Sequence, residues 1–78
     1  MKTTYYFRRK VRRRHKEIKR HYDQIEQALT HPLRVEPDKK GRTKRWIYLE
    51  DVDKYLRVIV QPDGETVHNA FYDKDFKP

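Results

Sequence analysis

Three side chains in the sequence could together cleave RNA without a metal ion. This reaction needs a base for the 2′-hydroxyl proton, an acid for the leaving 5′-oxygen and a cation for the developing charge. His15 could exchange the proton, because histidine is the side chain that titrates nearest to neutral pH. Arg45 could hold a phosphate through paired N–H groups, and Tyr48, like Trp46, could stack on an unpaired base. Each also has a structural interpretation: a histidine filling a helix stripe, a solvated strand arginine and core aromatic residues.

The basic residues are concentrated at the start of the chain. Residues 1–30 carry ten Lys or Arg against three Asp or Glu, and residues 31–78 carry ten against nine, so the net charge of +8 divides into +7 and +1. Such a run is typical of proteins that bind a polyanion, because Lys and Arg release condensed counterions from a phosphate chain. We therefore expect a nucleic acid partner, RNA rather than DNA, although a solvated helix face or a localisation-like tag would look similar. The expected contacts are Arg8, Arg9, Lys10, Arg12, Arg13, Arg14, Lys16 and, from a strand, Arg57.

Other classes of protein fit the sequence poorly. It has no cysteine for a disulfide or a thiolate metal site, and its four histidines do not occur at metal-ligand spacings, so we expect no metal and no cofactor. No apolar run approaches the roughly 20 residues of a membrane span, and residues 1–20 lack the apolar stretch of a signal peptide. We expect a cytoplasmic protein with no membrane partner.

The apolar spacing predicts one helix followed by strands. The helix stripe recurs every three or four residues and should end before Pro32; it comprises Val11, His15, Ile18, Tyr22, Ile25 and Leu29. Runs of β-branched and aromatic residues predict strands at 44–49, 55–60 and 66–72, with a short extended segment at 33–35. Turns are expected at 36–41 and at 62–64, where Asp63-Gly64 is a strong hairpin signal. Residues 3–7 could form a further strand, residues 1–10 could instead be a flexible basic arm, and 74–78 should be a loose tail.

These elements predict a single α+β domain over residues 1–78, with an N-terminal helix packed on a three- to four-stranded antiparallel sheet. Leu56, Val58 and Val60 should face the helix, because alternate residues of a strand share one face. Arg57 should then lie on the opposite face, which would be the floor of a site.

Several short segments together resemble a known group of nucleases. They are Arg14-His15-Lys16-Glu17-Ile18, Ile25 to Pro32, Arg45 to Tyr48, Tyr55 to Val60 and Val67 to Tyr72. In this order, over residues 14–75, the chain is similar to the small phage and toxin nuclease domains related to barnase, EndoU, the tRNA-cleaving colicins and RelE. The resemblance implies a catalytic site made of His15, Arg45, Tyr48 and Asn69. The chain departs from the pattern at two positions, with Asn69 where Thr is expected and Asp73 where a second hydroxyl often lies.

Two functions follow as expectations. The first is a metal-independent ribonuclease-like domain, a possible toxin that an acidic inhibitor protein would silence. The alternative is a non-catalytic nucleic-acid-binding module or regulator of a phage or mobile element. The two are distinguished by whether His15, Arg45 and Tyr48 converge in space.

Overall fold

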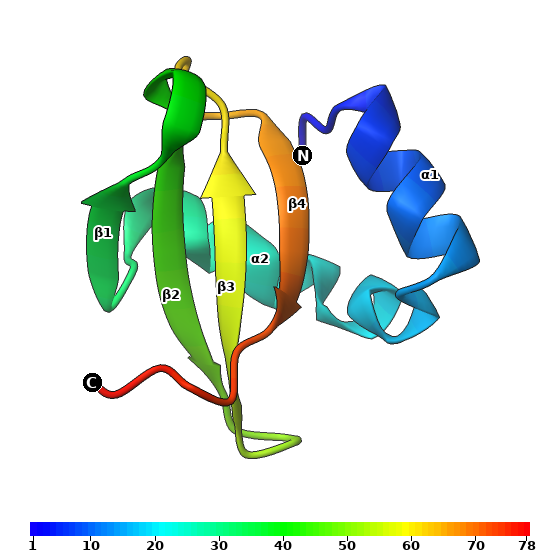
Figure 1. Cartoon of the computed structure of the whole chain (residues 1–78). Coiled ribbons are helices and arrows are strands. Elements are labelled where there is room, and N and C mark those ends of the chain that lie inside the picture. The colour runs from blue at the N-terminus through cyan, green and yellow to red at the C-terminus, as the bar shows by residue number, and fades with distance from the viewer.

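Helices and strands occupy two layers in the computed structural model, which describes residues 1–78 (Figure 1). The chain forms α1 (Tyr5–Arg13), the 3₁₀ helix η1 (Lys16–His21), α2 (Tyr22–Thr30), β1 (Arg34–Pro37), the 3₁₀ turn η2 (Lys39–Gly41), β2 (Thr43–Leu49), β3 (Lys54–Val60) and β4 (Val67–Tyr72). The strands form one antiparallel sheet in the order β1-β2-β3-β4, so each strand pairs with its neighbour in the sequence. The predicted α+β fold class is confirmed.

The predicted single N-terminal helix is interrupted at Arg14 and His15. The α1 helix ends at Arg13, His15 has non-helical backbone angles (φ −129°, ψ 52°), and the chain resumes as η1 and then α2. The interruption lies within the densest run of like charges, where repulsion between neighbouring turns disfavours a continuous helix. The apolar spacing still holds, since Val11, Ile18 and Ile25 are all buried, but the three residues reach the core from three different elements.

The first residues of the chain form a helix start rather than a strand or a flexible arm. Thr4 is the N-cap of α1, and its hydroxyl accepts a hydrogen bond from the Phe7 backbone N–H at 3.0 Å. Only Thr3 keeps an extended contact, a bridge to Val67 at the start of β4. Burial of Phe7 and Val11, four residues apart, fixes α1 against the rest of the protein.

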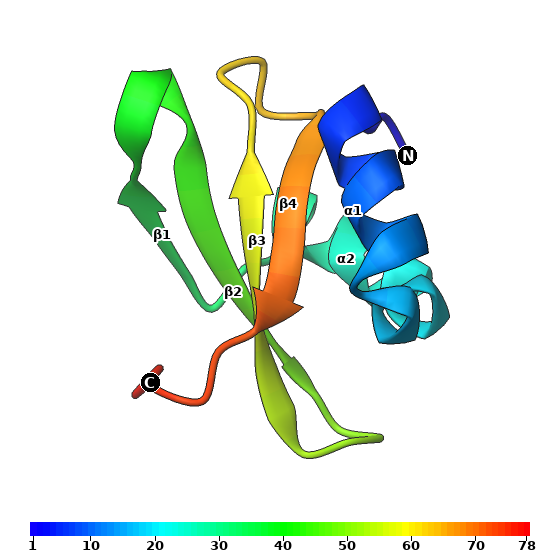
Figure 2. The ribbon, with the colours of Figure 1, turned by 45° about the vertical axis from the view of Figure 1, so that its right-hand side comes forward.

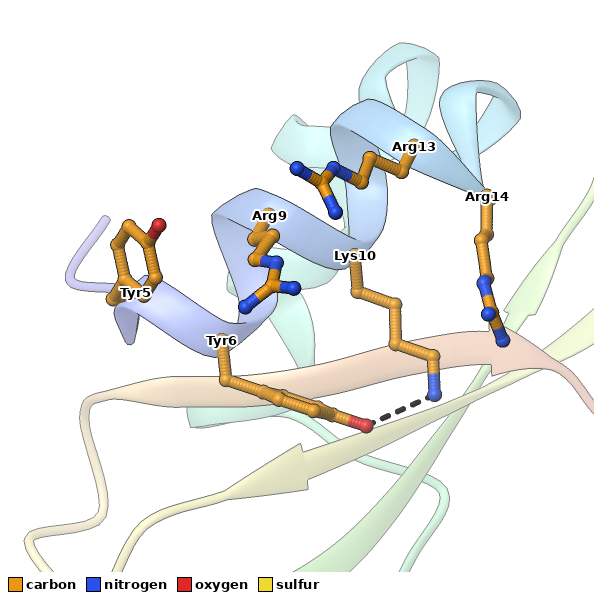
Figure 3. Close-up of a pocket in the computed structure, with 6 residues that line it drawn as sticks. All are labelled: Tyr5, Tyr6, Arg9, Lys10, Arg13 and Arg14. Atoms are coloured by element: carbon orange, nitrogen blue, oxygen red, sulfur yellow. Dashed lines mark hydrogen bonds between the residues drawn. The ribbon is translucent and has the colours of Figure 1, made fainter.

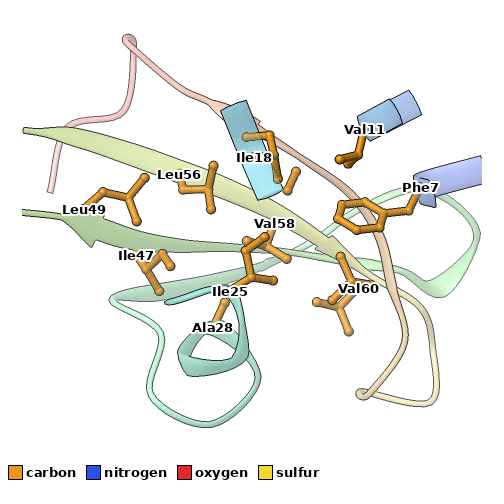
Figure 4. Close-up of a cluster of buried hydrophobic side chains, with 12 residues drawn as sticks. Phe7, Val11, Ile18, Ile25, Ala28, Ile47, Leu49, Leu56, Val58 and Val60 are labelled. Atoms are coloured by element: carbon orange, nitrogen blue, oxygen red, sulfur yellow. The ribbon is translucent and has the colours of Figure 1, made fainter. Parts of the chain in front are cut away.

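The core lies between the sheet and the helices (Figure 4). Leu56, Val58 and Val60 are fully buried in one cluster with Ile18 and Ile25, and Tyr22 packs against its edge, as the alternation along β3 predicts. The helix-facing side of the sheet is therefore closed to ligands.

The loops between strands follow the predicted turn chemistry. Gly41 and Gly64 both have positive φ angles, which suit glycine. The Asp63 carboxylate accepts hydrogen bonds from the backbone N–H groups of Glu65 and Thr66 and from the Thr66 hydroxyl. The hydroxyl bond, together with the backbone bonds, lowers the pKa of Asp63 to about 2. This turn sets the register of β3 against β4.

The segment after β4 was expected to be a loose tail, but it lies against the sheet through Asp73 and Phe76. In Figure 2 it leaves the end of β4 and turns back toward the side of the sheet that carries β1. Asp73 is buried, and the Phe76 ring stacks on the Trp46 indole with centroids 5.0 Å apart. No helix of the structure has the length and apolar character to cross a membrane.

Candidate nucleic-acid interface

The sheet separates two of the four predicted catalytic residues. Arg45 pairs across the strands with Val58, which faces the helices, whereas Tyr48 pairs with Tyr55 on the opposite side. We call that opposite side the outer face. It carries Lys44, Trp46 and Tyr48 of β2, Tyr55, Arg57 and Ile59 of β3, and Asn69 and Phe71 of β4.

Arg45 is engaged at the end of a helix. Its Nη1 donates to the carbonyl oxygens of Ala28 and Leu29, at 3.3 and 3.0 Å, and its Nε donates to the Thr43 hydroxyl. The last carbonyls of a helix have no partner within the helix and attract positive charge. Since the last turn of α2 has no basic residue of its own, Arg45 supplies this charge from β2.

Tyr48 and Asn69 lie on the outer face, each with a local partner. The Tyr48 hydroxyl donates to the Asp53 carboxylate, and this hydrogen bond raises the pKa of Tyr48. The Asn69 side-chain oxygen accepts a hydrogen bond from the backbone N–H of Ala70 at 3.0 Å.

His15 belongs to the helical layer. It lies at the interruption between α1 and η1, half-buried, with its Nδ1 3.4 Å from the Glu17 carboxylate. The four residues that the nuclease resemblance assigns to catalysis are thus distributed over the helical layer, the closed face of the sheet and the outer face. The structure does not bring them together into one site.

Seven of the eight predicted nucleic-acid-binding residues, in contrast, come from one short segment of the chain, residues 8–16. All but Arg57 lie on α1 or within three residues of its end, and of these only Lys10 is even half-buried. Because Phe7 and Val11 are the only buried residues of α1, the side of the helix opposite them faces solvent.

The charges of this surface are not neutralised within the protein. Arg8, Arg9, Lys10, Arg12, Arg13, Arg14, Lys16 and Lys19 form no ion pair with any carboxylate. The first turn of α1 has no acidic residue either. Clustered cations of this kind produce a strong positive potential over α1.

Tyr5 and Tyr6 lie beside these eight basic residues, and we call the ten residues together the α1 surface. Tyr5, Tyr6, Arg9, Lys10, Arg13 and Arg14 line a cavity of about 380 Å³ (Figure 3). They form two rows with a spacing of four residues, Tyr5-Arg9-Arg13 and Tyr6-Lys10-Arg14. The sequence contained this signal, but it is visible only once residues 5–13 are known to be a helix.

The two tyrosines differ in how firmly they are held. Tyr5 is 65% exposed, whereas Tyr6 stacks on the His68 ring at 4.8 Å and its hydroxyl accepts a hydrogen bond from Lys10. His68 also lies 3.2 Å from the Thr4 hydroxyl, which links the start of α1 to β4. Burial and then the charges of Arg42 and Lys40 lower the pKa of His68.

Arg57 takes part in a different arrangement, on the outer face. Its Nε and Nη2 donate to one oxygen of Asp73, at 3.0 and 2.9 Å, and its guanidinium lies over the rings of Trp46 and Phe71. The Trp46 indole N–H donates to the same oxygen at 2.9 Å. Burial alone would raise the pKa of Asp73, but these hydrogen bonds and the charge of Arg57 outweigh it, so the pKa lies below its usual value.

His21 is a buried polar residue that the sequence did not single out. Its Nε2 lies 2.8 Å from the Tyr72 hydroxyl, and its Nδ1 has no hydrogen bond, with the Asp51 carboxylate 3.9 Å away. Because His21 is fully buried, it cannot reach a substrate and instead links η1 to β4. The structure has no cluster of three or more His, Asp or Glu side chains arranged to hold a metal ion.

Comparison of the chain with protein-family models, with curated proteins and with solved structures gives no match. The residues and their geometry are therefore the basis for assigning a function.

Proposed function

We propose that this protein binds RNA through the α1 surface and acts as a binding module. The observation that carries the proposal is the group of eight Lys and Arg side chains on and after α1 that form no ion pair, next to the exposed Tyr5 and the half-exposed Tyr6. Cations along a backbone track combined with aromatic rings are typical of surfaces that bind single-stranded nucleic acid.

RNA is favoured over duplex DNA by the tyrosines. A tyrosine ring offers a flat surface on which an unpaired base can stack, and such stacking tolerates any base sequence because every base has a π-face. Phosphate contacts position a ligand without selecting its sequence, so we expect broad affinity rather than a single target.

The dispersed positions of His15, Arg45, Tyr48 and Asn69 favour binding over cleavage. Ribonuclease activity, and with it a toxin role and an inhibitor protein, stays a prediction from the sequence. Incubation of the purified protein with total RNA in the presence of a chelator tests it directly, and discrete fragments would restore the enzyme hypothesis.

The binding proposal is tested by a salt titration of RNA affinity, followed by fluorescence anisotropy. If about five phosphates are contacted, the slope of log affinity against log salt concentration should be roughly −3 to −4 for single-stranded RNA. The double variant Arg9→Gln/Arg13→Gln should reduce the magnitude of this slope by about 1.4, because each phosphate contact contributes about 0.7.

The matched control is Lys39→Gln/Lys40→Gln, which removes the same charge from exposed positions outside the α1 surface. It should leave the slope close to that of the parent. A slope near zero for the parent, equal effects of the two double variants, or tighter binding to duplex DNA than to RNA would each contradict the proposal.

A further inference from the structure

Phe76 fills a slot on the outer face of the sheet. Its ring stacks on the Trp46 indole at 5.0 Å with 18° between the planes, and the guanidinium of Arg34 lies over it, 4.8 Å from its centroid. Tyr55 closes one side, with its ring centroid 5.0 Å from that of Phe76. The slot is thus formed by an indole, a guanidinium and a phenol, all held by β1, β2 and β3.

The segment that carries Phe76 is held by few hydrogen bonds. The Phe76 N–H lies 3.5 Å from the Asp73 carbonyl oxygen, the Asp75 N–H donates to the Asp73 carboxylate, and Arg34 donates to the Lys77 carbonyl oxygen. None of these bonds belongs to the sheet. Phe76 can therefore leave the slot without breaking the pairing of any strand.

We propose that the slot accepts an unpaired base of RNA, and that Phe76 occupies it in the absence of RNA. The surfaces against the ring, an indole and a guanidinium, are those on which proteins stack single-stranded bases. A cavity of about 650 Å³ opens beside Phe76, with Tyr55, Arg57 and Phe71 among its lining residues, and gives a base a route to the slot.

The charges around this cavity suit a base rather than a phosphate. Its lining includes three acidic residues and three basic ones, so it carries no net charge, in contrast to the α1 surface, whose charged residues are all cations. The α1 helix lies beside β4 through the Tyr6–His68 stack, and β4 is one of the two edge strands of the sheet. The slot lies over β1, β2 and β3, so a strand bound on α1 reaches it by crossing the outer face from the β4 edge. One RNA strand can then place its phosphates on α1 and a base in the slot.

This inference rests on the proposed function and specifies its ligand as a single strand. Trp46 is the only tryptophan, so its fluorescence reports on the slot. The probes are a short unstructured RNA and the duplex formed from that RNA and its complement. When the single-stranded RNA is added, a base should displace the Phe76 ring from the slot and quench the fluorescence of Trp46. The duplex has no free base and should leave this fluorescence unchanged.

A gain of affinity gives the sharper test. Phe76→Ala removes the side chain that competes with the base for the slot. It should tighten single-strand binding about two- to tenfold, because one aromatic stack shifts the equilibrium between the filled and the open slot by about that factor. Duplex affinity should not change. Phe76→Leu still covers the slot with an apolar side chain but without a flat ring, and should give a smaller gain in single-strand affinity. The control is Leu33→Ala, at an exposed apolar position, which should give no gain.

The outcomes separate the two proposals, with circular dichroism used to verify the fold of each variant. If Phe76→Ala weakens single-strand binding, leaves it unchanged, or changes single-strand and duplex binding by the same factor, the slot is not a base site, and RNA binding by α1 still stands. If neither RNA binds the parent protein, both the proposed function and this inference fail.

Discussion

Removal of the Asp73 carboxylate should destabilise the protein, because this one group holds the outer face together. A single oxygen of Asp73 accepts hydrogen bonds from the Trp46 indole and from two nitrogens of Arg57. Asp73 and Trp46 are only 8% and 4% exposed, whereas the Arg57 side chain is 31% exposed. Water can therefore replace the lost partner of Arg57 but not that of Trp46.

The magnitude follows from this difference in exposure. An indole N–H left buried without a partner costs about 1–3 kcal/mol, and the lost charge-assisted bonds of Arg57 add less than their full value because water screens them. We expect Asp73→Ala to lower the free energy of unfolding by about 2–4 kcal/mol. Asp73→Asn keeps an acceptor for the indole and should cost about 1 kcal/mol.

Urea unfolding followed by circular dichroism measures these differences without relying on Trp46 fluorescence, which the substitutions would alter directly. The control is Asp75→Ala, an exposed carboxylate whose side chain makes no hydrogen bond, and it should stay within about 0.5 kcal/mol of the parent. If Asp73→Ala also stays within that range, or if Asp75→Ala costs as much, the Asp73 carboxylate does not hold the outer face together.

The same variants give a pH dependence with a definite sign. The pKa of Asp73 is lower in the folded protein than its ordinary value of 3.8, so the unfolded chain takes up the proton first as pH falls. The stability that the charge contributes is complete above about pH 4 and is lost as pH falls through the folded pKa. The difference between the parent and Asp73→Asn should accordingly shrink below that pH.

Three further predictions concern other parts of the molecule. Leu56→Ala should lower the free energy of unfolding by about 2–5 kcal/mol, measured by urea unfolding, because Leu56 is fully buried in the core; a cost below 1 kcal/mol would contradict this packing. Arg45→Met should lower the free energy of unfolding by about 1–2 kcal/mol, because the bonds to the end of α2 are lost, and should leave RNA affinity unchanged. A loss of RNA affinity at unchanged stability would instead make Arg45 a ligand contact. Because the pKa of His68 is lowered on folding, the stability of the parent should fall as pH drops below about 6.5. His68→Phe keeps the stack on Tyr6 and should reduce this loss of stability. Identical pH profiles of the two proteins would exclude His68 as its source.

The features that the sequence determined are those set by near neighbours. Alternation along 55–60 identified which residues of β3 face the core, and Asp63-Gly64 identified the β3–β4 turn. The segregation of charge into the first 30 residues is a property of composition alone. Alternation along β2 also predicts that Arg45 and Tyr48 lie on opposite faces of the sheet, because residues three apart on a strand point to opposite faces. The nuclease resemblance had placed both in one site.

Tertiary contacts decided the rest. Residues 3–7 have the composition of a strand, but burial of Phe7 and Val11 and the cap by Thr4 make this segment the start of a helix. The interruption at His15 lies within a run of like charges, but no Gly or Pro marks its position in the sequence, and the apolar spacing continues across it. The stack of Phe76 on Trp46 and the hydrogen bond from Trp46 to Asp73 join residues about 30 positions apart. Local periodicity carries no information about such contacts, because they form only when the sheet brings distant segments of the chain side by side.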